Sequence, residues 1–298
     1  MDIERATTLF LDSQRYFKNA TQTSLTSSRQ EIRHFTRSVG IVKVSDISAH
    51  NLGDYIINGL RERNWKMTTV LTKRHTLNPF FDWCVQQGHL NSNPLELIPK
   101  PRVEYHLMPS LTRQQASHLL TVVYNCYHRT DFSRYRSYAM IATCIFAGVR
   151  RSELFQLKVE EVDFGRQAII ITQGKGRKDR IIPLNESLST ILKEYINQRK
   201  KIHPTVPELF CQNSGKAKYC GYAFKFIINR FVKISAIPFT LNTLRHTFAT
   251  LLLESGADLH AISKMMGHAN IETTRRYLNV CVEHLRGQIG KHPVSIEK

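Results

Sequence analysis

A proline-rich stretch near residue 100 divides the chain into two parts of unequal length. Asn93-Pro94, Pro99-Lys100-Pro101-Arg102 and Met108-Pro109 fall within it, with little apolar periodicity. Proline fixes its own backbone, lacks an N–H donor and pushes the preceding residue toward an extended conformation. The stretch therefore predicts an extended linker, placed at 103–107, between domains at 1–102 and 108–298.

The first part is expected to be a small helical unit. Ser27 and Gln30 make a plausible capping box for its second helix, and Pro79 predicts a kink or break in its last one. Helical periodicity and stop signals predict helices at roughly 6–20, 28–39, 50–64 and 67–87. The basic side chains of this part are expected to be solvated surface, namely Arg29, Arg33, Arg37, Lys66, Lys73 and Arg74.

The second part combines helices with one hairpin. A helical pattern over 134–147 ends at Gly148, and a short helix is expected to begin near Ser152. Strand-like segments at 168–172 and 180–184 flank a basic, glycine-containing connection. Two further helical stripes, expected to be core, comprise Leu244, Phe248, Leu251 and Leu252, then Leu259, Ile262, Met265 and Met266 after an Asp258 cap. The fold class predicted is mainly α with a small antiparallel sheet.

Net charge is the one unusual property of the composition. The chain has 42 Lys and Arg against 24 Asp and Glu, so its formal charge is 42 − 24 = +18. Residues 1–105 carry 14 − 10 = +4, and the remainder carries 28 − 14 = +14. The positive charges in such an excess repel one another unless a polyanion neutralises them. Nucleic acid is therefore favoured as the binding partner, and an anionic membrane surface is the second candidate.

Several other classes of protein are excluded or disfavoured. No apolar run reaches the length of a membrane span, and the N-terminus lacks a secretory signal. The six cysteines are scattered without zinc spacing, which favours free thiols in a reducing cytoplasm. Gly174-Lys175-Gly176 fits neither a P-loop nor a dinucleotide motif, and no carboxylate cluster suits magnesium. No cofactor or metal is therefore expected.

Phosphoryl transfer without metal needs a nucleophile, fixed positive charges and an acid for the leaving oxygen. Arg150 lies in a turn between two predicted helices, with Glu153 close enough to orient it. Arg245 lies near a helix start, where the helix dipole also favours an anion. His268 follows the next helix, and Tyr277 comes nine residues later. Each residue alone is weak evidence, but their order and spacing are informative together.

This combination resembles the tyrosine recombinase, or phage integrase, family. The stretch Leu244-Arg245-His246-Thr247-Phe248-Ala249-Thr250 is followed by Gly256-Ala257-Asp258, Gly267-His268, Thr274 and Tyr277. The resemblance spans about 5–285, with most weight on 148–154, 174–184 and 240–280.

The resemblance implies a role for each matching residue. Arg150 and Arg245 would hold the non-bridging oxygens of the scissile phosphate, and Lys175 would protonate the departing 5′ oxygen. His268 would donate a hydrogen bond to the phosphate. Tyr277 would attack it to form a 3′-phosphotyrosyl link, which conserves the energy of the broken bond without ATP.

Two positions leave alternatives open. Lys175 is favoured as the acid, with Lys178 or Arg180 as rivals, and it could instead be a solvated charge.

The family usually has histidine three residues before the second arginine, where this chain has Asn242. Asparagine donates a hydrogen bond but does not move a proton near neutral pH. Asn242 would therefore act as a positioning donor, or the enzyme is slow, or His246 or water supplies the base.

The family implies a helical, SAM-like core-binding domain and a catalytic domain that close on double-stranded DNA as a C-shaped clamp. The simple two-domain length favours the Xer, integron or transposon-borne types. Their action implies a specific recombination site, a homo-tetramer in the synapse, and a mobile-element or chromosomal role in the bacterial cytoplasm and nucleoid. It leaves open a role for an accessory protein. The C-terminal segment with Val280, Val282 and Leu285 would join neighbouring protomers, although packing within the chain is the alternative.

Two other functions share the charge and part of the chemistry. A DNA-binding regulator that has lost catalysis would keep the fold, and Asn242 is the feature that favours it. A relaxing enzyme like the type IB topoisomerases would use a tyrosine without a defined site or a synapse.

Overall fold

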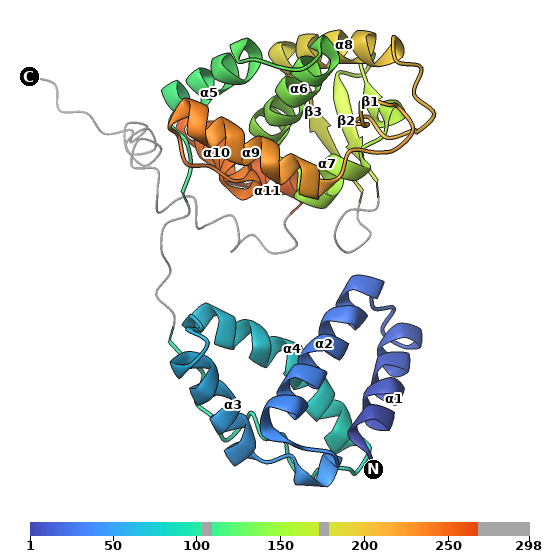
Figure 1. The fold of residues 1–298 in the computed structure, drawn as a ribbon, viewed down its shortest axis with the longest axis vertical. Helices are drawn as coiled ribbons and strands as arrows, with labels where there is room; N and C mark the ends of the chain where they lie inside the picture. Colours follow the sequence, from blue (N-terminus) through green and yellow to red (C-terminus); the bar gives the residue numbers. More distant parts are fainter. Residues whose placement is uncertain (103–108, 173–178, 268–298) are drawn as a thin grey trace, which may run out of the picture. The chain divides into compact units, whose positions relative to one another are not determined.

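The computed structural model describes residues 1–102, 109–172 and 179–267 (Figure 1). The chain separates into two compact units, Met1–Tyr105 and His106–Lys298. The fold is mainly helical with one small antiparallel sheet, which confirms the predicted fold class. The linker expected at 103–107 lies outside the described residues, so the domain boundaries placed there stay a prediction. No helix among the described residues is long and apolar enough to cross a membrane.

The first unit is a bundle of four helices whose core is rich in aromatic side chains. Phe10 and Phe80 meet edge to face at 5.4 Å between ring centroids, and Phe35 and Phe81 do so at 5.8 Å. All four rings are buried, and such pairs add to the free energy gained by burial alone. The helices are α1 (Ile3–Tyr16), α2 (Gln22–Val39), α3 (Ala49–Arg61) and α4 (Met67–Gln86), with a short 3₁₀ turn η1 (Val44–Asp46) before α3.

The predicted start of the second helix is wrong, and of the kink or break expected at Pro79 the break is absent. Helix α2 begins six residues before the predicted start at 28, because the Thr21 side chain accepts a hydrogen bond from the Ser24 N–H at 3.2 Å and caps the helix there. Helix α4 is not broken at Pro79. Its neighbours Leu77 and Phe80 are buried on either side, and their packing offsets the roughly 3 kcal/mol that an interior proline costs.

Two basic residues expected at the surface are parts of the interior instead. Lys73 pairs with Glu31 at 2.8 Å and lies 4.3 Å from the centre of the Trp65 ring. Arg74 is buried and donates to the carbonyls of Leu95 and Ile98, both at 3.0 Å. Lys73 thus links α4 to α2, and Arg74 links α4 to the segment that follows it, so the prediction of solvated surface fails at both positions.

The second unit is larger and holds the residues of interest. It contains the helices α5 (Arg113–Asn125), α6 (Asp131–Ala147), α7 (Arg151–Gln156), α8 (Glu186–Lys200), α9 (Gly221–Ser235), α10 (Leu241–Glu254) and α11 (Leu259–Met266). Its strands are β1 (Val162–Asp163), β2 (Ala168–Ile171) and β3 (Arg180–Pro183), preceded by the 3₁₀ turn η2 (Val159–Glu161).

Helix α6 is the central element of this unit, and it packs against α5, α8 and α10 (Figure 1). Most of its side chains are buried, so it is apolar on nearly every side. The three strands pair antiparallel in the order β1-β2-β3, with Ile171 opposite Arg180 at the end of the β2–β3 ladder. The two predicted strands therefore pair antiparallel, while β1 and the helices α5, α8 and α9 were not predicted from the sequence.

A small separate core joins α10 to α11. Phe248 and Leu253 of α10 pack with Ile262 and Met266 of α11, and all four are buried. The Asp258 side chain caps α11 by accepting from the Ala261 N–H at 2.8 Å. Both stripes thus form core as predicted, and this core fixes where the last turn of α11 points.

Candidate active site

The turn between α6 and α7 places Arg150. Gly148 ends α6 with a left-handed φ of 56°, and a Cβ on it would lie 2.3 Å from the Phe248 ring of α10. Only glycine allows the two helices to approach this closely. Two residues later Arg150 caps α7, and its backbone N–H donates to the Glu153 Oε2 at 2.6 Å. The turn therefore holds both ends of Arg150, backbone and side chain, next to Glu153.

The Glu153 carboxylate binds two guanidinium groups. Oε1 accepts from the Arg150 Nη1 at 2.8 Å and from the Arg180 Nη1 at 2.7 Å. Oε2 accepts from the Arg180 Nη2 at 2.7 Å in addition to the Arg150 backbone. Its side chain is only 6% exposed. A buried carboxylate has about four lone-pair sites, and here four donors occupy them.

These contacts set the protonation of Glu153. Burial alone would raise its pKa, but the hydrogen bonds and charges of Arg180 and Arg150 outweigh burial and hold the pKa at about 2. Glu153 is therefore ionised at neutral pH, which keeps both guanidinium groups oriented.

Arg245 comes from α10 and meets the same region. It is buried, and it donates to the Gly148 carbonyl and, at 2.7 Å, to the Met266 carbonyl. Arg150 donates to the neighbouring Gly267 carbonyl. The two arginines that the sequence assigns to a phosphate are therefore brought together at the C-terminal end of α11.

The C-terminal end of α11 attracts positively charged side chains. Its last carbonyls carry the negative end of the helix dipole, which favours cations. Gly267 ends the helix with a φ of 64°, and a Cβ there would lie 2.9 Å from the Arg180 Cδ and 3.2 Å from the Arg150 Nη1. Glycine is thus required both for the backbone and for the space that the arginines occupy.

Asn242 and His246 lie on the same helix as Arg245. Asn242 is exposed in the first turn of α10, and His246 is partly buried. Burial lowers the pKa of His246, and the charge of Arg245 lowers it further, so the imidazole is neutral near pH 7. Lys175, His268 and Tyr277 lie outside the described residues, as does the rival Lys178. Their roles stay predictions.

Arg180 is the member of the cluster whose place the sequence did not predict. It was weighed only as a rival acid, yet its side chain is 8% exposed and bound to Glu153. A signal was available in the strand: alternation puts Arg180 on the same side as the buried Ile182, and opposite the exposed Ile181.

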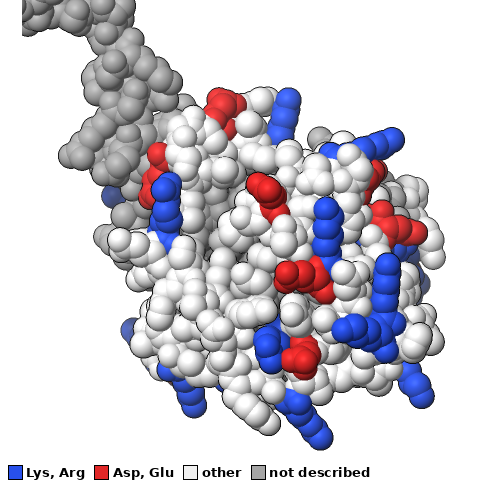
Figure 2. Space-filling view, turned by 90° about the horizontal axis from the view of Figure 1, so that it is seen from above, with Lys and Arg blue, Asp and Glu red and all other residues white. Residues whose placement is uncertain are grey.

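Charge on one face of this unit is mixed. The face on the side of α5, α6 and α8 shows Lys and Arg interspersed with Asp and Glu (Figure 2). Helix α8 itself carries Glu186 and Glu194 beside Lys193 and Lys200. No described group of three or more His, Cys, Asp and Glu side chains is arranged to bind a metal ion.

Comparison with known proteins gives the class of this chain, the site-specific recombinases that act on DNA. Residues 109–284 match the model of the phage integrase family, and the chain belongs to that family. It is 31% identical over 239 residues to the tyrosine recombinase XerC of Thermodesulfovibrio yellowstonii, covering 77% of each chain. It is 27% identical to XerC of Serratia marcescens, covering 93% of this chain and 89% of that one.

The fold has a similar solved structure. The Tn1549 transposon integrase in complex with transposon right end DNA matches with a TM-score of 0.76 and 20% identity, covering 99% of this chain and 100% of that one.

We expect Glu153→Gln to lower the free energy of unfolding at pH 7 by about 3 kcal/mol, because an amide cannot balance two buried guanidinium charges. The folded pKa of about 2 lies below the ordinary value of 4.5, so this stabilisation is present above pH 4.5 and is lost as pH falls toward 2. Urea unfolding should therefore show the difference between wild type and variant shrinking by about half at pH 3.

The matched control is Glu160→Gln, which changes an exposed glutamate in the same part of the unit. It should have little effect at either pH. If the Glu153→Gln difference is equal at pH 7 and pH 3, packing rather than ionisation accounts for it.

Proposed function

We propose that this chain is a site-specific tyrosine recombinase that cuts and rejoins DNA through a covalent 3′-phosphotyrosyl intermediate. Family membership supports the activity, and one observation of the structure carries it: Arg150 and Arg245, from distant segments, donate to adjacent carbonyls at the end of α11. His268 follows those carbonyls directly in the sequence. The residue roles are those that the family pattern assigns.

In the proposed reaction the Tyr277 oxygen attacks the scissile phosphorus and forms the P–O bond of the phosphotyrosyl link. The bond to the 5′ oxygen breaks, and that oxygen takes a proton from Lys175. Arg150, Arg245 and His268 stabilise the negative charge of the five-coordinate phosphate. The reverse attack by a 5′ hydroxyl of another strand restores the phosphodiester and frees Tyr277, so no external energy source is needed.

The tyrosine proton needs an acceptor that Asn242 does not supply. Asn242 is exposed at the start of α10, where its amide is suited to donate a hydrogen bond to phosphate. His246 is neutral near pH 7 and so has the protonation state of a base. We propose that Asn242 acts as a positioning donor, and that His246 or water accepts the proton.

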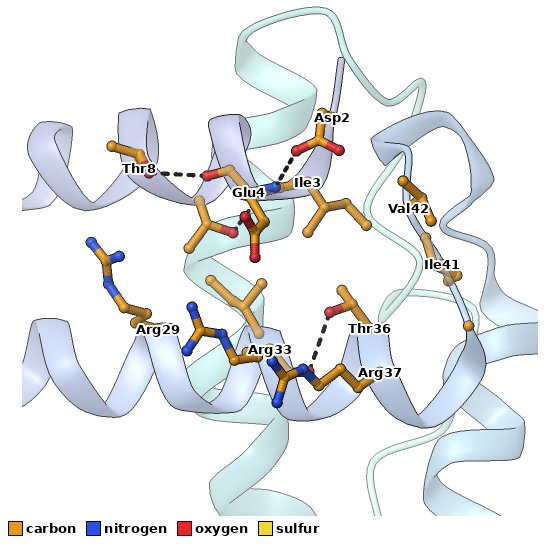
Figure 3. Close-up of a pocket in the computed structure, with 13 residues that line it drawn as sticks. Asp2, Ile3, Glu4, Thr8, Arg29, Arg33, Thr36, Arg37, Ile41 and Val42 are labelled. Atoms are coloured by element: carbon orange, nitrogen blue, oxygen red, sulfur yellow. Dashed lines mark hydrogen bonds between the residues drawn. The ribbon is translucent and has the colours of Figure 1, made fainter.

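Double-stranded DNA is the proposed partner, and α2 offers a surface for it. Arg29, Arg33 and Arg37 lie four residues apart, about 6 Å per step along the helix, beside a groove of about 440 Å³ between α1 and α2 (Figure 3). None of the three forms an ion pair within residues 1–102. Glu4 faces them across the groove, while Asp2 is engaged as the α1 cap.

We propose in addition that the domains at 1–102 and 108–298 close on the duplex as a clamp, and that four protomers assemble on paired sites. The apolar residues Val280, Val282 and Leu285 support a role for the C-terminal segment in joining protomers.

Covalent trapping tests the proposed chemistry. Purified protein is mixed with sheared genomic DNA from the source organism and stopped with detergent, and the DNA that stays attached to protein is sequenced. Wild type should yield covalent adducts at a defined sequence. Tyr277→Phe should yield none while it binds the recovered site with unchanged affinity, because only the attacking oxygen is removed.

The contrary outcomes separate the other two functions. Specific binding without adducts in wild type, with adducts restored by Asn242→His, identifies a regulator that has lost catalysis. Adducts of equal yield on the recovered site and on random duplex identify a relaxing enzyme like the type IB topoisomerases.

Replacing Arg29, Arg33 and Arg37 together by glutamine should weaken binding to a random-sequence duplex mainly at low salt. Each lost phosphate contact changes the slope of log K against log salt by about 0.9, so the triple variant should lose about 2 to 3 from the slope. Fluorescence anisotropy between about 50 and 200 mM salt measures it.

The matched control removes the same number of exposed cations elsewhere in the unit, with Arg5, Lys18 and Arg61 changed to glutamine. An equal fall in slope for both variants would mean that α2 contributes only general charge.

Ending the chain after residue 284 should abolish stable synapsis and leave binding to a single site intact, because only the contact between protomers is removed. Native gels with one-site and paired-site DNA measure the two properties separately. The point variant Leu285→Asp should act in the same direction in a full-length chain. Normal synapsis by both variants would assign the segment to packing within its own protomer.

A further inference from the structure

Three arginine side chains donate hydrogen bonds to three successive carbonyls at the C-terminal end of α11. Arg180 donates from Nε to the Met265 carbonyl at 2.7 Å, and Arg245 donates to the Met266 carbonyl at 2.7 Å. Arg150 donates to the Gly267 carbonyl. Three successive carbonyls thus each accept from a different guanidinium group. Arg180 and Arg150 are in turn joined through Glu153.

Arg180 is more buried than Arg150, and all three of its guanidinium nitrogens are hydrogen-bonded within the protein. Nε, Nη1 and Nη2 each donate to an acceptor within the protein, two on Glu153 and one on Met265. Its side chain is 8% exposed, against 20% for Arg150. The Arg180 contacts to Glu153 and Met265 leave only two of its five N–H groups without a partner among these acceptors, so its main contacts are structural ones. Arg180 is also a poor proton donor, because arginine stays charged throughout the usable pH range.

Arg180 also lies at a structural junction. It opens β3 and pairs with Ile171 at the end of the β2–β3 ladder, where the chain leaves the sheet for the connection that contains Lys175. Its side chain reaches α7 through Glu153 and α11 through Met265. One residue therefore joins three elements that carry, or immediately precede, residues of the proposed reaction.

We infer that Arg180 is a positioning residue for strand cleavage: it locks Glu153 and the end of α11 so that Arg150 is held in register for the scissile phosphate. The inference rests on the proposed recombinase function. Arg180 contacts no reacting atom in this scheme, and its effect passes through Glu153 and the Met265 carbonyl. The four side chains together carry a charge of 3 − 1 = +2, so Glu153 orients the cluster without neutralising it.

Geometry rather than charge alone is what Arg180 supplies. The three acceptors lie in the directions of a planar fork, which a lysine ammonium cannot match. Arg180→Lys keeps the charge and loses the fork, whereas Arg180→Gln loses both. Arg166→Gln is the matched control, since Arg166 is 81% exposed in the turn that joins β1 to β2.

The first measurement is single-turnover cleavage on a nicked duplex of the trapped site, with enzyme in excess and duplex affinity measured in parallel. Arg180→Gln should cut about 100-fold more slowly, a loss typical of a misplaced catalytic group, with affinity changed less than about threefold. Arg180→Lys should recover only part of the rate. Wild-type cleavage by Arg180→Lys would overturn the inference, because charge alone would then suffice.

A double-mutant cycle with Glu153→Gln tests the route of the effect. If Arg180 acts through Glu153, the double variant should be within about threefold of Glu153→Gln alone. Losses that multiply would show an independent action and would overturn the inference.

Hydrogen exchange of the DNA-free protein separates this inference from the proposed function. Exchange over 259–266 should be about 10-fold faster in Arg180→Gln and unchanged in Arg166→Gln, because the last turn of α11 loses its anchor. Unchanged exchange in Arg180→Gln rejects the positioning role. If wild type does not cleave DNA, the recombinase proposal fails, while the exchange result still decides whether Arg180 fixes α11.

Discussion

The ionised carboxylate of Glu153 is the interaction on which the rest of the candidate site depends. A buried carboxylate is costly unless it is fully bonded, and here two guanidinium groups and a backbone N–H meet that requirement. The same contacts cap α7, orient Arg150 and fix Arg180. Removal of the carboxylate would leave two buried cations with no counter-charge between them, so the turn, the strand and the helix that carry them would all be affected.

The end of α11 is the second half of this arrangement. Helix ends leave carbonyls without partners inside the helix, and most proteins satisfy them with water or local caps. Here arginines from three distant segments take these carbonyls, and the small core of Phe248, Ile262 and Met266 holds the helix in place for them. Packing of α10 on α11 and the electrostatics of the cluster therefore reinforce each other, and the space that Arg150 and Arg180 occupy requires glycine at position 267.

Much of this could be predicted from the sequence where the signal is local. The apolar stripes of α10 and α11, the Asp258 cap and the β2–β3 hairpin follow from periodicity and capping chemistry, and the structure has all of them. The start of α2 was predicted wrongly because both Thr21 and Ser27 have a hydroxyl that can cap a helix. In the structure Thr21 is the cap. The continuity of α4 across Pro79 and the burial of Lys73 depend on partners far along the chain, which periodicity does not contain. The same reason hid Arg180, whose partners lie 27 and 85 residues away.

This chain has Asn242 at the position where the family usually has histidine. Asn242 is exposed at the start of α10 and takes no part in the bonds that hold Glu153, Arg150 and Arg180 together. A histidine or an asparagine there leaves the charge of the arginine cluster itself unchanged, so the attraction of the three arginines for a phosphate does not depend on which is present. What changes is the ability to move a proton, which matters only as Tyr277 attacks. In the proposed catalysis the cluster therefore supplies the electrostatic part, and the residue at position 242 supplies a hydrogen bond to the phosphate and decides whether a proton acceptor stands there.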